Sequence, residues 1–138
     1  MSMEENKAKI LRFYDEVINK GNLSIINDLV SANIVDHHIP PELPKGAEGL
    51  KQMVIMFRTA FPDINMTSEE MIAEGDKVVC RFIMRGTHKG ELMGIAPTGK
   101  QVTVSGIETN RFEQGKSVER WEQADTMGLM QQIGAAPS

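Results

Sequence analysis

The fold is decided by residues 101–125, which read QVTVSGIETNRFE, then QGK, then SVERWEQAD. In the first arm, residues 101–113, apolar and polar side chains alternate as they do in a strand with one buried face. Residues 114–116 place a glycine between the two arms, which is typical of a tight turn. The pattern predicts a β-hairpin whose two strands are neighbours in a sheet.

Before this hairpin, the sequence predicts helices first and further strands second. Helices are expected over about 4–19, in a short segment after Gly21, and from about 46 to 61. A short extended piece is expected at 34–38, strands at 64–73 and 77–87, a glycine-containing loop at 86–100, and a short apolar segment at 127–133. This order indicates an α+β fold.

We expect one domain over residues 1–138, with residues 1–3 and 135–138 as loose tails. We expect the N-terminal helices to pack on a strongly curved, mostly antiparallel sheet. In such a cone-shaped fold the sheet and helices are expected to enclose an apolar pocket for a hydrophobic small-molecule ligand.

Composition limits the classes of partner. The net charge of −4 and the lack of a long basic run argue against nucleic acid, which requires a concentrated basic face. No apolar run approaches the roughly 20 residues that span a bilayer, so no membrane partner is expected. The polar start MSMEENKAK and the single Cys80, expected to be a buried structural thiol, favour a cytoplasmic location.

Two polar residues fall on the apolar face of the strand at 101–113. Glu108 and Asn110 share this face with Val102, Val104 and Phe112. An unpaired carboxylate is costly there and tends to take up a proton, which makes Glu108 a candidate site residue. The alternative is that Glu108 lies near a sheet edge or pairs with an arginine.

The hairpin brings a second carboxylate next to the first. A turn at 114–116 places Phe112 near Val118 and Glu108 near Glu122. Like charges at this spacing raise the pKa of one group and leave an acid beside a base. Arg120 on the same face, or Arg81 on the neighbouring strand, would instead neutralise the pair.

The histidines and methionines add weaker candidates. His37 and His38 are adjacent and so point in opposite directions on an extended chain, and the usual zinc spacings are absent. We therefore expect no metal, and a role at the pocket rim for His38. Core packing is the expected role of the methionines, although flexible thioethers such as that of Met93 also suit a pocket for a hydrophobic ligand.

Several motifs, in the same order along nearly the whole chain, resemble the SnoaL-like polyketide cyclase family, also described as ester cyclase-like, within the NTF2-like superfold. These are Glu48-Gly49-Leu50, Ala60-Phe61-Pro62-Asp63, Ala73-Glu74-Gly75-Asp76, Gly86-Thr87-His88-Lys89-Gly90-Glu91-Leu92, Gly94-Ile95, Pro97-Thr98-Gly99-Lys100, and Trp121-Glu122 with Asp125.

The resemblance implies a homodimer through the outer sheet face and an intramolecular aldol ring closure that uses neither cofactor nor metal. Aligned by the hairpin glycine, the family's catalytic aspartate falls on Glu122 and its pocket histidine on Glu108. A pocket asparagine of the family falls close to Asp36. The acid–base position is kept, while its surroundings become more acidic.

Three hypotheses follow. The first is acid–base catalysis on a hydrophobic carbonyl compound, such as aldol-type cyclisation or isomerisation, by Glu122 and Glu108, in a pocket with Asp36, His38, Arg81, Met93, Asn110 and Arg120. The second is epoxide hydrolysis, which relatives perform with two carboxylates and an arginine around a water. The third is a non-catalytic domain that binds an apolar small molecule, in which the glutamates pair structurally with arginines.

Overall fold

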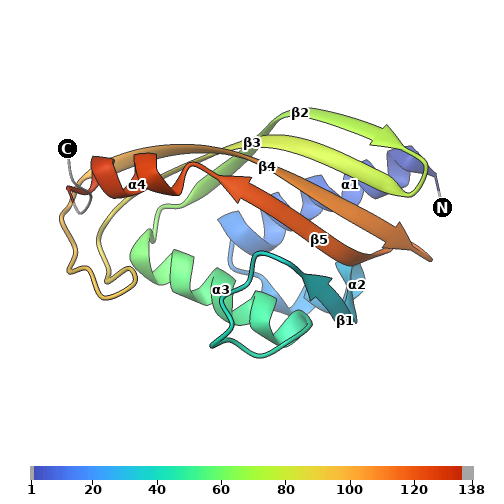
Figure 1. Cartoon of the computed structure of the whole chain (residues 1–138), viewed down its shortest axis with the longest axis horizontal. Coiled ribbons are helices and arrows are strands. Elements are labelled where there is room, and N and C mark those ends of the chain that lie inside the picture. The colour runs from blue at the N-terminus through green and yellow to red at the C-terminus, as the bar shows by residue number, and fades with distance from the viewer. Residues whose placement is uncertain (1, 135–138) are drawn as a thin grey trace.

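The computed structural model describes residues 2–134, so the predicted tail at 135–138 lies outside the described residues. Helices cover one side of a curled, open five-stranded sheet (Figure 1). The predicted α+β class is confirmed. Within the described part of the chain, no helix is long and apolar enough to cross a membrane.

The first helical segment starts earlier than the sequence predicts. Helix α1 (Met3–Arg12) continues directly into a π-helical segment, η1 (Phe13–Asn19). The Ser2 side chain accepts a hydrogen bond from the Glu5 backbone N–H, and the Glu5 side chain accepts one from the Ser2 backbone in return. This capping box satisfies backbone donors that would otherwise lack partners. Ser2 and Met3 therefore do not form the loose tail expected at residues 1–3.

The sheet has the order β1-β5-β4-β3-β2. Strands β2 (Asn65–Glu74), β3 (Lys77–Thr87), β4 (Gln101–Glu113) and β5 (Lys116–Ala124) form the predicted antiparallel meander. Strand β1 (Val30–Asp36) adds to the β5 edge in a parallel orientation. Because of this pairing, a segment from the first third of the chain lies beside the last strand.

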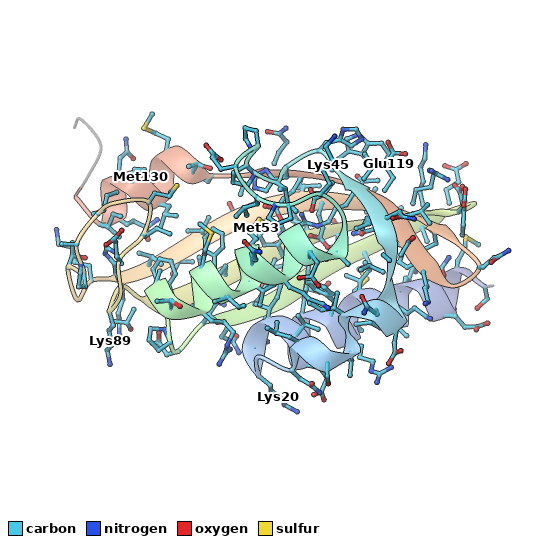
Figure 2. The ribbon with its side chains drawn as sticks, turned by 90° about the horizontal axis from the view of Figure 1, so that it is seen from below. Lys20, Lys45, Met53, Lys89, Glu119 and Met130 are labelled. Atoms are coloured by element: carbon cyan, nitrogen blue, oxygen red, sulfur yellow. The ribbon has the colours of Figure 1, made fainter. Side chains whose placement is uncertain are left out.

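The remaining helices complete the layer. A 3₁₀ turn, η2 (Leu23–Ile25), leads into α2 (Ile26–Leu29), while α3 (Ala47–Ala60) packs on the concave side and α4 (Thr126–Gln132) follows β5. Side chains fill the space between α3 and the sheet, among them the buried Met53 (Figure 2). The concave face is thus mostly a packed core.

A close approach in this core depends on a glycine. Gly106 of β4 lies directly under the ring of Phe82 on β3, and a Cβ at this position would come within 2.3 Å of the ring. Beside this ring, the buried Cys80 thiol lies between the Tyr14 hydroxyl at 3.4 Å and the Ser68 hydroxyl at 3.3 Å. Cys80 is fully buried, which confirms the predicted buried cysteine. Burial also raises the pKa of its thiol, which argues for a structural role.

Candidate active site

The β4–β5 hairpin places the two predicted glutamates side by side. Glu108 pairs directly with Glu122, and Asn110 pairs with Arg120. This register is the predicted one over the middle of the strands. Nearer the turn it differs, because Phe112 pairs with Ser117 instead of Val118 and an irregularity follows at Arg111/Phe112.

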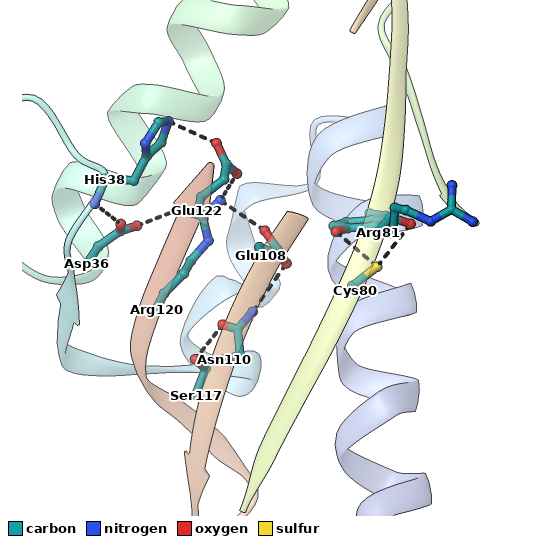
Figure 3. Close-up of polar contacts among 10 residues, drawn as sticks. Asp36, His38, Cys80, Arg81, Glu108, Asn110, Ser117, Arg120 and Glu122 are labelled. Atoms are coloured by element: carbon teal, nitrogen blue, oxygen red, sulfur yellow. Dashed lines mark hydrogen bonds and ion pairs between the residues drawn. The ribbon is translucent and has the colours of Figure 1, made fainter. Parts of the chain in front are cut away.

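Arg120 is the centre of the site. Its Nη1 donates to Asp36 Oδ2 at 2.8 Å, and its Nη2 donates to Glu108 Oε2 at 3.0 Å and to Glu122 Oε1 (Figure 3). The side chain of Arg120 is only 8% exposed, and those of Asp36 and Glu108 are 2% and 5% exposed. One buried guanidinium therefore holds three carboxylates from three strands, which we call the Arg120 cluster.

Strand β1 supplies Asp36 and positions the residues after it. Its parallel pairing sets Asp36 opposite Arg120, and the His37 backbone N–H donates to the Arg120 carbonyl at 2.9 Å. The other carboxylate oxygen of Asp36 accepts from the His38 backbone N–H at 2.8 Å. Asp36 thus fixes both the guanidinium and the chain that carries His38.

The two adjacent histidines contact opposite faces of the sheet, although they lie in the turn after β1 and not in the extended chain predicted over 34–38. His38 Nε2 lies 2.8 Å from Glu122 Oε2 on the concave side. His37 Nε2 lies 2.7 Å from Glu119 Oε2, and its ring stacks on Trp121 at a centroid distance of 5.1 Å. Only His38 therefore contacts the Arg120 cluster.

On its other side, Glu108 is held by a short polar chain. Asn110 Nδ2 donates to Glu108 Oε1 at 3.2 Å, and the Ser117 hydroxyl donates to Asn110 Oδ1 at 2.6 Å. All three side chains belong to buried residues. Both oxygens of Glu108 consequently have donors, one neutral and one charged.

The pKa values of the two glutamates are shifted in opposite directions. Burial raises the pKa of Glu108, although Arg120 opposes this effect. Burial also acts to raise the pKa of Glu122, but Arg120 and His38 outweigh it and hold that pKa below its usual range. The hydrogen bond that His38 donates to Glu122 raises the pKa of His38. With His38 protonated, three carboxylates face two cations, and a proton on Glu108 makes the cluster neutral.

The cavity beside this cluster is small. Its volume of about 20 Å³ is room for about one water molecule. The polar part of its wall is made by Glu108, Asn110, Ser117 and Arg120, with Lys9 at α1, and its apolar part by Ile10, Phe13, Leu29, Val30, Leu50 and Phe112. The sequence predicts a ligand-sized pocket, whereas these apolar side chains fill most of that space.

Two predicted pocket residues lie elsewhere. Arg81 occupies the outer face of β3, where its Nε is 3.7 Å from Glu70 Oε1. Its neighbours Cys80 and Phe82 face the core instead, because side chains alternate along a strand. Met93 is 56% exposed in the loop between β3 and β4 and is not part of the cavity wall. Arg81 and Met93 therefore lie apart from the Arg120 cluster, whereas Asp36, His38 and Asn110 lie beside Arg120, Glu108 and Glu122. Of these predicted residues, Glu108, Asn110 and Arg120 line the cavity.

Sequence reasoning missed Ser117. Its inward position depends on the irregularity near the turn, for which the alternation of residues 117–125 contains no signal. Within residues 2–134, no group of three or more histidine, cysteine or acidic side chains is arranged to hold a metal ion. The three carboxylates of the cluster instead converge on Arg120.

Comparisons with known proteins identify proteins of similar sequence and fold. The sequence profile described as SnoaL-like polyketide cyclase matches residues 8–133. A proposed polyketide cyclase from Bacillus cereus is 30% identical, with a TM-score of 0.85 over 99% of this chain and 87% of that one. AclR, a proposed hydroxylase from Streptomyces galilaeus, is 31% identical, with a TM-score of 0.85 over 99% of this chain and 89% of that one.

A third structure supports the fold alone. TsrD from Streptomyces laurentii is 23% identical, with a TM-score of 0.91 over 99% of both chains. No protein with a curated description matches the sequence.

Proposed function

The chain belongs to the SnoaL-like polyketide cyclase family, and on this premise we propose that it catalyses proton transfer on a hydrophobic carbonyl compound without a cofactor. The reaction would be an aldol-type cyclisation or an isomerisation. Family membership alone leaves the chemistry open, since one fold hosts many activities. The proposal therefore depends on the residues of the Arg120 cluster.

Glu122 is the proposed general acid and base. Its side chain is 11% exposed, more than any other carboxylate of the Arg120 cluster. Arg120 and His38 keep its pKa low, so that it is ionised at neutral pH. Each carboxylate oxygen has two acceptor sites, so Oε2 can accept from His38 and still take a proton from a carbon next to a carbonyl.

Glu108 is the proposed hydrogen-bond donor to the developing enolate oxygen. Burial favours its protonated form, and a neutral carboxylic acid can stabilise an enolate by donating to it. The small cavity adjoins this residue, which provides a place where a substrate oxygen can enter. We propose that the substrate widens this cavity when it binds.

A single observation carries this function: Glu108 and Glu122 lie opposite each other, and their pKa values are shifted in opposite directions. Two carboxyl groups with separated pKa values provide an acid and a base at the same pH.

The experiment measures deuterium exchange at the central carbon of 1,3-diketones with apolar chains, followed by NMR in D₂O. Wild-type protein should accelerate the exchange, and Glu122→Gln should lose about 100-fold or more, the usual contribution of a general base. Glu119→Gln is the matched control, because Glu119 lies on the same strand but pairs with His37 and Arg111. Full activity of Glu122→Gln would contradict the assigned role.

Epoxide hydrolysis is the second candidate. The observation in its favour is that Arg120 lies between Glu108 and Glu122 beside a cavity of about one water's volume. A carboxylate can activate such a water while a protonated acid assists ring opening. Incorporation of ¹⁸O from labelled water into the diol of an apolar epoxide would support it, and an unchanged epoxide would exclude it for the compound tested.

A binding domain without catalysis is the third candidate, and the ion pairs of both glutamates with Arg120 favour it. It predicts a ligand-induced rise in melting temperature with no exchange of any diketone by the wild-type protein. The exchange experiment thus separates this candidate from the first.

We also propose that the chain forms a homodimer through the outer face of the sheet. Ile72, Val79 and Ile107 are exposed apolar residues on β2, β3 and β4, and burying such a face is favourable. Light scattering should give twice the monomer mass, and Ile107→Lys should return it to the monomer value. A monomeric wild-type protein would contradict the proposal.

The proposed location is the cytoplasm. Cys80 is a free, buried thiol, which suits a reducing compartment. Fractionation of the source cells would test this, and recovery outside the cytoplasmic fraction would contradict it.

A further inference from the structure

His38 is the member of the site that reaches solvent. Its side chain is 33% exposed, against 11% for Glu122 and 8% for Arg120. Its Nε2 is 2.8 Å from Glu122 Oε2. It therefore joins a nearly buried carboxylate to the outside in a single step.

We infer that His38 relays protons between Glu122 and solvent during catalysis. This inference rests on the proposed function of Glu122. His38 acts through Glu122 and not on the substrate. It differs in this from Arg120 and Asp36, which hold the site in place and have no contact that leads outward.

The contacts of Glu122 favour such a relay. Oε1 is occupied by the Arg120 guanidinium, and an arginine side chain does not release a proton at physiological pH. Glu108, the other acidic neighbour, is more deeply buried than Glu122. A proton taken up by Glu122 therefore has His38 as its polar exit among the contacts that the structure describes.

The relay moves protons only. When Glu122 takes a proton from carbon, the C–H bond breaks, its electron pair stays on the substrate as an enolate, and an O–H bond forms. Neutral His38 with its hydrogen on Nδ1 accepts this proton at Nε2 and releases the Nδ1 proton to water. This step restores the Nε2–H that donates to ionised Glu122. In the reverse direction, water protonates Nδ1, and Nε2 returns its proton to Glu122 and then to the enolate.

The groups that face His38 determine its pKa and therefore the pH range in which the relay can work. Glu122 and Arg120 face it from β5, and Asp36 faces it from β1. The hydrogen bond that His38 donates to Glu122 has the largest effect and raises the pKa of His38, while partial burial opposes this shift. Since the relay needs neutral His38 to accept a proton, the exchange rate should fall as the pH drops through this pKa.

Two variants and a neighbouring control test the relay by deuterium exchange. His38→Gln keeps a donor to Glu122 but cannot carry a proton, so exchange should fall about 10-fold or more, within the range of general acid–base groups. Its rate should also lose the pH dependence assigned to His38. His37→Gln should keep the wild-type rate, because His37 contacts Glu119 and Trp121 on the opposite face.

His38→Ala allows a rescue experiment that distinguishes a proton relay from a purely structural role of His38. Removing the ring leaves space at a partly exposed position, and added imidazole should restore exchange in this variant but not in Glu122→Gln. An unchanged rate in His38→Gln, or a loss in His38→Ala that imidazole does not restore, would overturn the relay. If Glu122→Gln is also fully active, the proposed function fails as well, so the two failures can be told apart.

Discussion

Replacing Arg120 by methionine should expose how strongly the site depends on one guanidinium. Arg120→Met keeps an unbranched side chain but removes the charge that Asp36, Glu108 and Glu122 share. The three carboxyl groups would then be buried together without it. Like charges in a low-dielectric site repel and favour protonation, so the damage should depend on pH.

The magnitude follows from the burial of the cluster. Removing one partner of a buried ion pair costs about 3–5 kcal/mol of unfolding free energy. Because Arg120 serves three carboxylates at once, we expect a loss near the upper end, about 5 kcal/mol, near pH 7.5. A domain has only about 5–15 kcal/mol of stability, so the variant should be close to unfolding. Its melting temperature should fall by about 10–20 °C.

The loss should shrink as the pH falls. Without Arg120, burial and mutual repulsion raise the pKa values of the carboxyl groups above their unfolded values. The folded variant then binds more protons than the unfolded chain, and its stability rises toward lower pH. In the wild-type protein, Glu122 does not add stability as the pH falls, because its folded pKa is below its usual value.

The assay is urea unfolding followed by the fluorescence of Trp121, the single tryptophan, at about pH 7.5 and about pH 5. The neutralised control is Arg120→Met combined with Asp36→Asn, Glu108→Gln and Glu122→Gln, which removes all three buried carboxylates and should recover most of the lost stability. A loss below about 1 kcal/mol near pH 7.5, or an equal loss at both pH values, would refute the buried charge argument.

Two further predictions test other parts of the structure. The pKa of His38 is raised on folding, so its stabilising effect is complete below its unfolded pKa and is lost as the pH rises through its folded pKa. Wild type should exceed His38→Gln by about 1 kcal/mol at about pH 6, a value reduced for partial exposure, and by nothing at about pH 9; an excess that grows with pH would contradict this. Gly106→Ala should cost about 1–3 kcal/mol, because its Cβ would lie 2.3 Å from the Phe82 ring. Gly75→Asn, at an open turn position with φ 59°, should cost less, and equal losses would contradict the packing explanation.

The pairing of Glu108 with Glu122 was predictable because its signal is local. Alternation assigns each residue of 101–113 to a face, and a glycine turn fixes the pairing of the next strand. The details near the turn were not predictable. Gln114 and Gly115 both have positive φ, as in a two-residue turn, which pairs Glu113 with Lys116 and Phe112 with Ser117. One extra residue on β5 restores the predicted register beyond Arg111 and leaves Ser117 facing inward.

The role of Asp36 was harder to predict from the sequence, because it depends on a contact between distant parts of the chain. Asp36 and Arg120 are 84 residues apart, and the parallel pairing of β1 with β5 brings them together. No local pattern specifies which edge of the sheet receives β1. In contrast, the sequence does show which arginine faces the two glutamates. Alternation with Val78, Cys80 and Phe82 assigns Arg81 to the outer face of the sheet, which leaves Arg120.

The charge balance of the cluster favours a chemical role over a purely structural one. A structural network gains most when each buried carboxylate has its own cation, because an uncompensated buried charge is expensive. Here Asp36, Glu108 and Glu122 share Arg120, and the second cation, His38, exists only while its ring is protonated. Neutrality then requires a proton on one carboxyl group, and burial favours Glu108. The raised pKa of Glu108 and the lowered pKa of Glu122 on adjacent strands are the separation that the proposed proton transfer would use.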